Sequence, residues 1–406
     1  MSDRVWTPDA PRSRLTIMAK TVWILGSGFS KSLGGPLLND LLSDRSGGEA
    51  RQRLIELSSA VTSGERLMMD RKGGELAPDY GLVYKIYAEH LRGNDASKGK
   101  AVHWEHAEEF LTFVDSTSDD APRRALLKSW LPSDRNGDEG TDWFRRAVVS
   151  AIASECNFVQ TASVKRDETW RPYIRWGSER ATADDSIVTF NYDLVLETLG
   201  DSQLAAPVSR KGVATPGKPK PLSGYVPIYK LHGSVNWFVN HNGTVHDDGV
   251  DIFRSTISNH TPLIGTPGVS KRTVRDKFLD SIWEEAKKAL TEAEVVVFLG
   301  YRSPPSDPDA RQFILDAIST PEAVRGAPRH RRVHLVLGPN THDPAVTRLE
   351  KLIEFSMAPH GRIKRYILGH SKNTPRYEVL KQPLYVEDFL SACPKTELDG
   401  TRPEDD

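Results

Sequence analysis

The sequence predicts an α/β protein: a doubly wound, mostly parallel, Rossmann-like sheet with a large helical insertion after the first strand. Three observations support this prediction. Short apolar runs recur along the chain, a glycine-rich turn follows the first of them, and a long stretch of helical periodicity separates the first run from the second. Apolar runs that alternate with helices are typical of parallel sheets covered by helices on both faces.

The composition is that of a large and nearly neutral protein. The 406 residues carry 54 basic and 55 acidic side chains, so no overall charge favours a nucleic acid or a membrane surface. The two cysteines, Cys156 and Cys393, exclude a disulfide framework and a four-cysteine zinc site. No apolar run approaches the roughly 20 residues that span a bilayer, and residues 1–14 lack a signal-peptide core. We therefore expect a soluble protein of a reducing cytoplasm.

The first strand and its turn occupy residues 20–36. Gly26 and Gly28 would let the backbone turn sharply and approach a ligand, and a helical pattern resumes after Pro36. A strand, a glycine turn and a helix N-terminus together favour a bound phosphate. Lys31 stands where a strict G-x-G-x-x-G fingerprint has its third glycine, so an ordinary strand–helix turn is the alternative.

The next long segment has the residue pattern of helices rather than strands. Residues 37–180 have helical periodicity, and we expect an insertion subdomain there that forms an oligomer or partner surface. The Rossmann-type domain would comprise residues 19–36 and 181–392, between a flexible leader at 1–18 and an acidic tail at 393–406. Four tryptophans of the insertion are expected in its core or in an interface: Trp104, Trp143, Trp170 and Trp176.

The strand pattern returns in the second half of the chain. Strands are predicted at residues 186–190, 228–231, 294–299 and 333–337, with a short one near 364–368. Helices are predicted at about 194–199, 274–291, 308–318 and 344–355. Loops are predicted at 208–224, which we expect to be mobile, and at 240–250 and 256–272.

Glycines and polar residues stand where the predicted strands end. Ligands of open parallel sheets bind outside the carboxyl ends of the strands, so we predict that these residues meet in one crevice. In chain order they are Gly26-Ser27-Gly28, Asn191-Tyr192-Asp193, His232-Gly233-Ser234, Gly300-Tyr301-Arg302-Ser303 and Gly338-Pro339-Asn340.

These strand ends resemble the motifs of the sirtuin-like (SIR2) superfamily, and in particular its bacterial SIR2-like branch. The resemblance covers residues 20–40 and 186–340. The runs Thr-Phe-Asn-Tyr-Asp and Lys-Leu-His-Gly-Ser-Val-Asn-Trp resemble the motif sequences of the bacterial branch. The matched positions are Gly26 and Gly28 of the first turn, Thr189, Asn191 and Asp193 of a Thr-x-Asn-x-Asp motif, and His232 and Gly233 of a His-Gly pair. A later Gly-x-Ser turn is approximated by Gly300 and Ser303.

The resemblance implies an enzyme that cleaves NAD+, its substrate, at the nicotinamide–ribose bond. Protein deacylases of this superfamily carry a zinc ribbon with two Cys-x-x-Cys pairs, which this chain lacks, so we expect NAD+ hydrolysis rather than lysine deacylation, and no metal. Bacterial SIR2-like proteins are associated with anti-phage defence, as oligomers or beside a HerA-type ATPase or a short Argonaute. We expect a homo-oligomer or one of these partners, without direct binding to a membrane or a nucleic acid.

The residue types suit this chemistry. Asn191 could orient a water or the ribose hydroxyls, Asp193 could accept from a ribose hydroxyl or hold nicotinamide, and His232 could take a proton from ribose or water. The predicted binding residues are Gly26, Ser27, Gly28, Phe29, Ser30, Thr189, Gly233, Ser234, Gly300 and Ser303.

Structural alternatives exist for the catalytic candidates. Asn191 and Asp193 are as well suited to an Asx-turn and a helix N-cap, and His232 to a strand-end histidine bound to backbone. Ser27 and Ser234 do not satisfy G-x-S-x-G, so we expect neither to be a nucleophile.

Two further clusters have a plainer interpretation that we favour. His103, His106, Glu108 and Glu109 have a spacing that could bind a metal, but a solvated helix face explains them as well. The basic run Arg325, Arg329, His330, Arg331 and Arg332 could contact phosphate, but a solvated loop explains it.

Two other functions compete with NAD+ hydrolysis. One is a non-catalytic module that binds NAD+ or ADP-ribose and regulates a partner. The other is an ADP-ribosyltransferase acting on a protein or a nucleic acid.

Overall fold

The computed structural model describes most of the chain. The described residues are 20–37, 40–42, 79–91, 104–105, 107–161, 168–179, 181–201, 207–239, 243–247, 262–265, 274–319, 331–357 and 377–392. The predicted leader, the acidic tail, the strand near 364–368 and the pair His103 and His106 lie outside these ranges.

A six-stranded parallel sheet forms the centre of the molecule, which confirms the predicted fold class. Its order is β3-β2-β1-β7-β8-β9, which is 3-2-1-4-5-6 when the strands of this sheet alone are counted, the order of doubly wound dinucleotide-binding folds. The sheet grows in one direction from β1 to β3 and in the other from β7 to β9. The strands are β1 (Thr21–Leu25), β2 (Ser186–Thr189), β3 (Ile228–Lys230), β7 (Val295–Leu299), β8 (Arg331–Val336) and β9 (Tyr377–Gln382).

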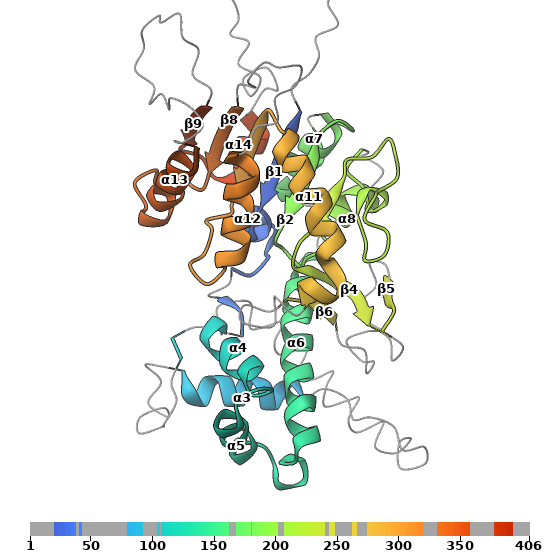
Figure 1. Cartoon of the computed structure of the whole chain (residues 1–406), viewed down its shortest axis with the longest axis vertical. Coiled ribbons are helices and arrows are strands. Elements are labelled where there is room, and N and C mark those ends of the chain that lie inside the picture. Colours follow the sequence, from blue (N-terminus) through green and yellow to red (C-terminus); the bar gives the residue numbers. More distant parts are fainter. Residues whose placement is uncertain are drawn as a thin grey trace, which may run out of the picture.

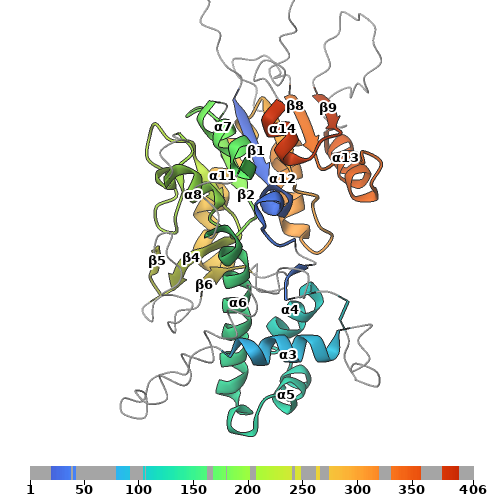
Figure 2. The ribbon, with the colours of Figure 1, turned by 180° about the vertical axis from the view of Figure 1, so that it is seen from behind.

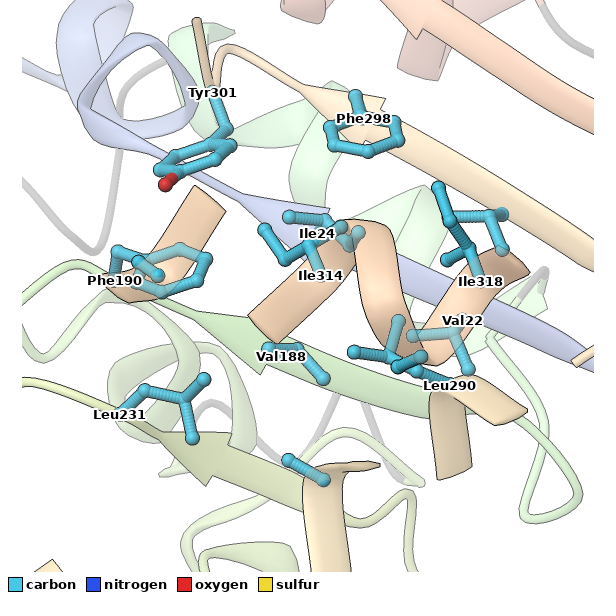
Figure 3. Packing of buried hydrophobic residues seen from close by; sticks show 14 of the residues in the cluster. Val22, Ile24, Val188, Phe190, Leu231, Leu290, Phe298, Tyr301, Ile314 and Ile318 are labelled. Atoms are coloured by element: carbon cyan, nitrogen blue, oxygen red, sulfur yellow. The ribbon is translucent and has the colours of Figure 1, made fainter. Parts of the chain in front are cut away.

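Helices cover both faces of this sheet. Alternate residues of β1 point to opposite faces, so Val22 and Ile24 pack with α11, α12 and α13, while Trp23 and Leu25 pack with α7, α8 and α14. Figure 1 shows α11 and α12 in front of the sheet, Figure 2 shows α7 and α14 on the reverse side, and Figure 3 shows the packing on the first face. The helices are α7 (Arg171–Glu179), α8 (Val195–Asp201), α11 (Asp280–Glu292), α12 (Pro308–Ser319), α13 (Pro344–Met357) and α14 (Val386–Ala392).

A helical lobe lies between β1 and β2 in the sequence and below the carboxyl edge of the sheet in Figure 1. Its core includes Trp104, Phe110 and Phe144, and α6 extends from this core to pack against the strands β4 and β6. Trp170 and Trp176 instead pack beneath the central sheet, so α7 covers the sheet although it lies within the predicted insertion. The helices of the lobe are α3 (Tyr80–His90), α4 (Ala107–Ser116), α5 (Ala121–Trp130) and α6 (Asp138–Thr161).

A second, antiparallel sheet was not predicted. Its order is β5-β4-β6, from β4 (Gly233–Val239), β5 (Val245–Asp247) and β6 (Pro262–Ile264). The prediction of loops over 240–250 and 256–272 is therefore wrong where β5 and β6 form. Three-residue strands carry too little periodicity to be recognised, and here they are stabilised by pairing with β4 on either side.

Two other local predictions are corrected. Helical backbone begins directly after the first strand, at α1 (Ser27–Ser30), and continues through the 3-10 turn Lys31–Leu33. Most of the helix predicted after Pro36 lies outside the described residues. The segment 208–224 is folded rather than a loose loop, because it contains the 3-10 turn Arg210–Gly212 and a bridge from Val213 to Ile228 of β3.

The basic run before β8 is neither a solvated loop nor a phosphate site at its described positions. Arg331 is fully buried in β8 and donates to backbone carbonyls at the C-terminal ends of α11 and α12, among them Ala293 at 3.0 Å and Thr291 at 2.7 Å. A cation is favourable there because helix C-termini carry partial negative charge. Arg332 pairs with Glu378 of β9 at 3.2 Å, and Arg325, Arg329 and His330 lie outside the described residues.

No helix in the described part of the chain combines the length and apolar character needed to cross a bilayer.

The buried His334 of β8 makes stability depend on pH. Burial, and secondly Arg332, lower its pKa from 6.5 to about 4. Between these pH values the unfolded chain takes up a proton that the folded chain does not, so stability present above pH 6.5 is lost as the pH falls toward 4. We expect a loss on the order of 3 kcal/mol over this window, measured by urea unfolding at several pH values. His334→Gln should flatten the dependence and His342→Gln, at an exposed position, should not; equal slopes for both variants would contradict this assignment.

Candidate functional site

The turns that follow β1 and β7 are in direct backbone contact. The Gly28 amide donates to the Gly300 carbonyl at 3.2 Å, and the Gly26 amide donates to the Leu299 carbonyl at 3.1 Å. A Cβ atom on Gly300 would lie 2.5 Å from the Gly28 carbonyl carbon, and one on Gly26 would lie 2.6 Å from Tyr301 Cα. Glycine is therefore required for the two turns to meet, at the point where the direction of sheet growth reverses.

This contact changes the expectation for a phosphate cradle. The amides of Gly26 and Gly28 are used in the contact between the turns, and the Phe29 amide donates to the Gly26 carbonyl at 2.8 Å. The amides of Gly26 and Gly28 are therefore bound by the neighbouring turn and do not face outward toward a phosphate. The Phe29 ring packs in the core against Tyr173, and Ser30 is buried, whereas Ser27 is partly exposed.

Asn191 lies against the glycine turn. Its side-chain nitrogen donates to the Gly26 carbonyl at 2.9 Å, and its backbone amide donates to the Thr189 hydroxyl at 3.1 Å. The structure thus joins the ends of β1 and β2, and it uses Thr189 to hold the backbone of Asn191. Asp193 accepts from the Val195 amide at 3.1 Å and so forms the Asx-type cap at the start of α8.

His232 occupies the short turn between β3 and β4. Its carbonyl accepts from the Gly265 amide at 2.7 Å, and its ring lies 5.0 Å from the Phe190 ring. The Nε2 atom lies 3.0 Å from a carboxylate oxygen of Asp307, and both side chains are buried. An imidazole beside a buried carboxylate is an arrangement that can accept and hold a proton.

The sequence analysis did not single out Asp307. The residue precedes Pro308 at the start of α12, where its other carboxylate oxygen accepts from the Ala310 amide at 3.3 Å. Such a position is read from sequence as a helix N-cap. Its second role depends on the turn after β7 coming close to the turn after β3, which no local pattern shows.

His232 and Asp307 line a cavity of about 1050 Å³ between the carboxyl edge of the central sheet and the helical lobe. One wall includes Trp283 of α11, and the opposite wall comes from α4 and α5. Asn191, Asp193 and the glycine turn do not line this cavity.

An aromatic pair connects the glycine turn to this cavity. Tyr301, which packs on Gly26, stacks on Phe190 at 4.4 Å between ring centroids, and Phe190 in turn contacts His232. Figure 3 shows Phe190 and Tyr301 side by side. Burial, and secondly the charge of Asp307, raise the pKa of Tyr301 well above its ordinary value, so its phenol stays protonated.

Residues 185–354 match the family model of the SIR2-like domain. This match supports a relationship between the chain and the SIR2-like family. Members of that family are NAD-dependent enzymes, which supports an enzyme that acts on NAD. The matched segment runs from just before β2 to within α13, so it contains Asn191, His232 and Asp307, whereas the glycine turn lies before it. A search of curated proteins found no match.

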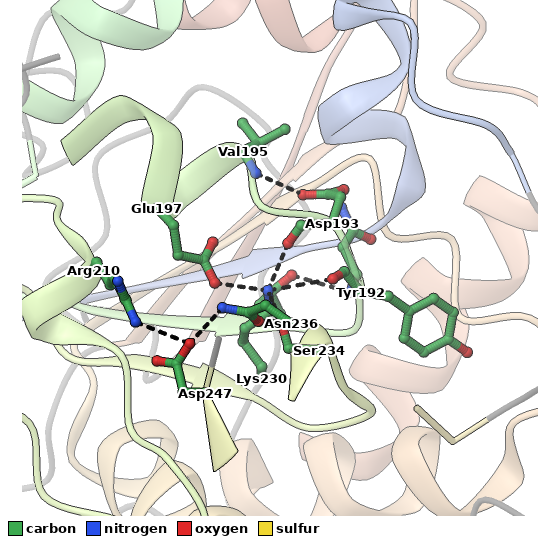
Figure 4. Close-up of polar contacts among 11 residues, drawn as sticks. Tyr192, Asp193, Val195, Glu197, Arg210, Lys230, Ser234, Asn236 and Asp247 are labelled. Atoms are coloured by element: carbon green, nitrogen blue, oxygen red, sulfur yellow. Dashed lines mark hydrogen bonds and ion pairs between the residues drawn. The ribbon is translucent and has the colours of Figure 1, made fainter. Parts of the chain in front are cut away.

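Two predicted binding residues of the matched segment face the interior of the protein. Gly233 has φ +86°, and a Cβ atom there would lie 2.0 Å from the Leu263 carbonyl oxygen, so glycine lets β4 pair with β6. Ser234 is fully buried, and its hydroxyl accepts from Lys230 Nζ at 2.7 Å. Lys230 also pairs with Glu197 at 2.9 Å, and Figure 4 shows this buried network.

The turn after β7 has an unusual backbone. Ser303 is buried with φ +50°, a left-handed conformation that residues other than glycine rarely adopt, and Arg348 donates to its carbonyl at 2.8 Å. Such strain is found where surrounding structure fixes a functional turn. The residues of the turn after β8 do not line the cavity. In that turn Asp343 pairs with Arg302 at 3.2 Å, and the Asn340 side chain accepts from the His342 amide.

Across the described ranges, no group of three or more His, Cys, Asp or Glu side chains could hold a metal ion.

The contact between the two turns predicts an unequal response to alanine. Gly300 and Gly217 both have positive φ, but only at Gly300 would a Cβ atom collide with backbone. We expect Gly217→Ala to cost about 1 kcal/mol from backbone strain alone. Gly300→Ala should cost on the order of 3 kcal/mol or more, since packed backbone must move. Urea unfolding followed by circular dichroism measures both. A cost for Gly300→Ala no greater than for Gly217→Ala would show that the turns tolerate separation.

Proposed function

We propose that this protein hydrolyses NAD+ at the nicotinamide–ribose bond to give nicotinamide and ADP-ribose. One observation carries the proposal: a buried His232–Asp307 pair lines a cavity at the carboxyl edge of a sheet that matches a SIR2-like domain. SIR2-like domains bind NAD+, and ligands of doubly wound sheets bind at this edge.

The dimensions and surroundings of the cavity support a nucleotide-sized substrate. A volume of about 1050 Å³ is at the upper end of small-molecule sites. The nicotinamide ribose would occupy the cavity beside His232. The rest of the dinucleotide would extend along the sheet edge past Tyr301 toward Asn191 and Ser27, which is the partly exposed residue of the glycine turn.

The reaction needs little acid assistance, because nicotinamide leaves as a neutral molecule. Cleavage passes through an oxocarbenium-like state that a water then attacks. In our proposal His232 takes a proton from that water, and the carboxylate of Asp307 stabilises the imidazolium that results. NAD+ and water thus become nicotinamide, ADP-ribose and one proton.

The aromatic wall would limit competing reactions. The rings of Phe190, Tyr192 and Trp283 lie 5.0, 6.2 and 6.5 Å from the His232 ring. We expect these apolar rings, of which Trp283 lines the cavity, to reduce the access of water to the base once the substrate is bound.

The setting of this activity stays a prediction from the family resemblance. From that resemblance we expect the protein to act in the cytoplasm as an effector of anti-phage defence that depletes NAD+. We expect it to be active as a homo-oligomer or beside a HerA-type ATPase or a short Argonaute.

Substitution of the two central candidates tests the proposal. His232→Ala should lower nicotinamide release by about 10²-fold or more, because the base is lost. Asn191→Ala should also lower it, because the amide beside the glycine turn is lost. Chromatographic detection of nicotinamide and ADP-ribose gives the rates, and thermal melting shows that each variant is folded. Full turnover in both folded variants would refute the site, and binding of NAD+ without turnover by the wild type would instead favour a binding module.

The carboxylate of Asp307 should matter for proton transfer and not only for folding. Asp307→Asn keeps an oxygen for the cap of α12, but the carboxylate no longer favours the protonated imidazole. We expect the rate to fall by about 10-fold to 10²-fold and the acid limb of the pH–rate profile to move to lower pH. Asp343→Asn is a control at the start of another helix that begins with proline, α13, where Asp343 accepts from the Ala345 amide at 2.8 Å and pairs with Arg302 at 3.2 Å. The same loss in both variants, with an unchanged profile, would assign Asp307 a structural role alone.

A further inference from the structure

The cavity beside His232 has a wall that the SIR2-like match does not include. That wall is formed by α4 and α5 of the helical lobe, whereas the matched segment begins at residue 185. Glu108, in the first turn of α4, contributes a carboxylate to it. Across the cavity, Arg275 precedes α11 and Ser306 lies in the turn before α12.

Three polar atoms of these cavity residues are buried without a hydrogen-bond partner among the described residues. They are Oε1 of Glu108, Nε of Arg275 and Oγ of Ser306. A buried polar atom without a hydrogen-bond partner destabilises the folded protein.

A buried carboxylate elsewhere in the same lobe is satisfied. Glu155 of α6 accepts from the Tyr84 hydroxyl at 2.6 Å and from the Leu42 amide at 3.0 Å. Buried polar atoms without a partner also occur elsewhere among the described residues, Oε2 of Glu197 among them, but these three belong to residues that line one cavity, where a ligand would complete them.

The three groups define the chemistry of the occupant. A carboxylate oxygen only accepts hydrogen bonds and a guanidinium nitrogen only donates them. The occupant must therefore present a hydrogen-bond donor toward Glu108 and an acceptor or an anion toward Arg275. The Arg275 guanidinium is held 4.3 Å above the ring of Trp283, which fixes it at the cavity wall.

We propose that Glu108 is a specificity-determining residue that accepts a hydrogen bond from the nicotinamide nucleoside part of NAD+. The donor is the carboxamide N–H or a ribose O–H, and Arg275 faces the phosphate that follows the ribose. This inference rests on the proposed function and deepens it: the helical lobe, which the family model does not cover, supplies part of the substrate site.

Calorimetric titration of the full chain with NAD+ and with ADP-ribose tests this assignment. A His232→Ala background keeps NAD+ from being consumed. Glu108→Gln exchanges one acceptor oxygen for a donor, and we expect it to weaken NAD+ binding by about 10-fold. Because NAD+ carries a net negative charge on its phosphates, mere removal of a negative side chain would tighten binding instead. Glu89→Gln, a half-buried carboxylate of α3 in the same lobe that does not line the cavity, should leave affinity within about twofold.

The two ligands separate the possible donors. ADP-ribose keeps the ribose but lacks the carboxamide, so weaker binding of both ligands by Glu108→Gln assigns the contact to a ribose hydroxyl. Weaker binding of NAD+ alone assigns it to the carboxamide. Unchanged or tighter NAD+ binding by Glu108→Gln overturns this inference and leaves the proposed function standing. If a folded chain with Glu108 intact binds neither ligand, the proposed function fails and this inference fails with it.

Discussion

The contact between the turns after β1 and β7 is the constraint on which the site depends. Two backbones approach so closely that the positions of Gly26, Gly28 and Gly300 leave no room for a Cβ atom. This contact occurs where the two halves of the sheet meet, so it fixes the relative position of the elements on either side. Tyr301 packs directly on Gly26, and Asn191 binds the carbonyl of that same glycine. The glycines that the sequence suggested for a ligand thus first serve to bring the two halves together.

A buried ion pair has a comparable role at the other end of the site. Lys230 of β3 contacts Glu197 of α8 at 2.9 Å and Ser234 of β4 at 2.7 Å, and it also donates to the Asp193 carbonyl. Figure 4 shows how these groups converge on the ammonium. Burial raises the pKa of Glu197, and Lys230 acts in the opposite direction. The loss of either partner would leave a buried charge uncompensated. The network therefore joins β3, β4 and α8 around the turn that carries His232.

The candidate site combines a matched and an unmatched part of the chain. The SIR2-like segment provides His232, Asp307 and the aromatic wall, while the helical lobe closes the cavity from the other side. The lobe has its own aromatic core, and α6 connects it to the small antiparallel sheet. The shape of the candidate site therefore depends on the lobe as well as on the matched segment, since function depends on the site rather than on the fold alone.

The sequence by itself determined the parallel sheet, because each of its central strands is a short apolar run buried on both faces, a signal that is local. It also indicated that Asn191 and His232 lie at the same edge of the sheet, since parallel strands end at one edge, whereas the pairing of their two strands is seen only in the structure. Only the tertiary structure decided the strands β4, β5, β6 and β9, which depend on pairing partners more than on their own periodicity. Only the tertiary structure placed Asp307 beside His232 and Glu108 at the cavity wall, because both contacts join segments far apart in the chain. A distance between such side chains depends on how helices and turns pack in three dimensions, and no local pattern of residues encodes it.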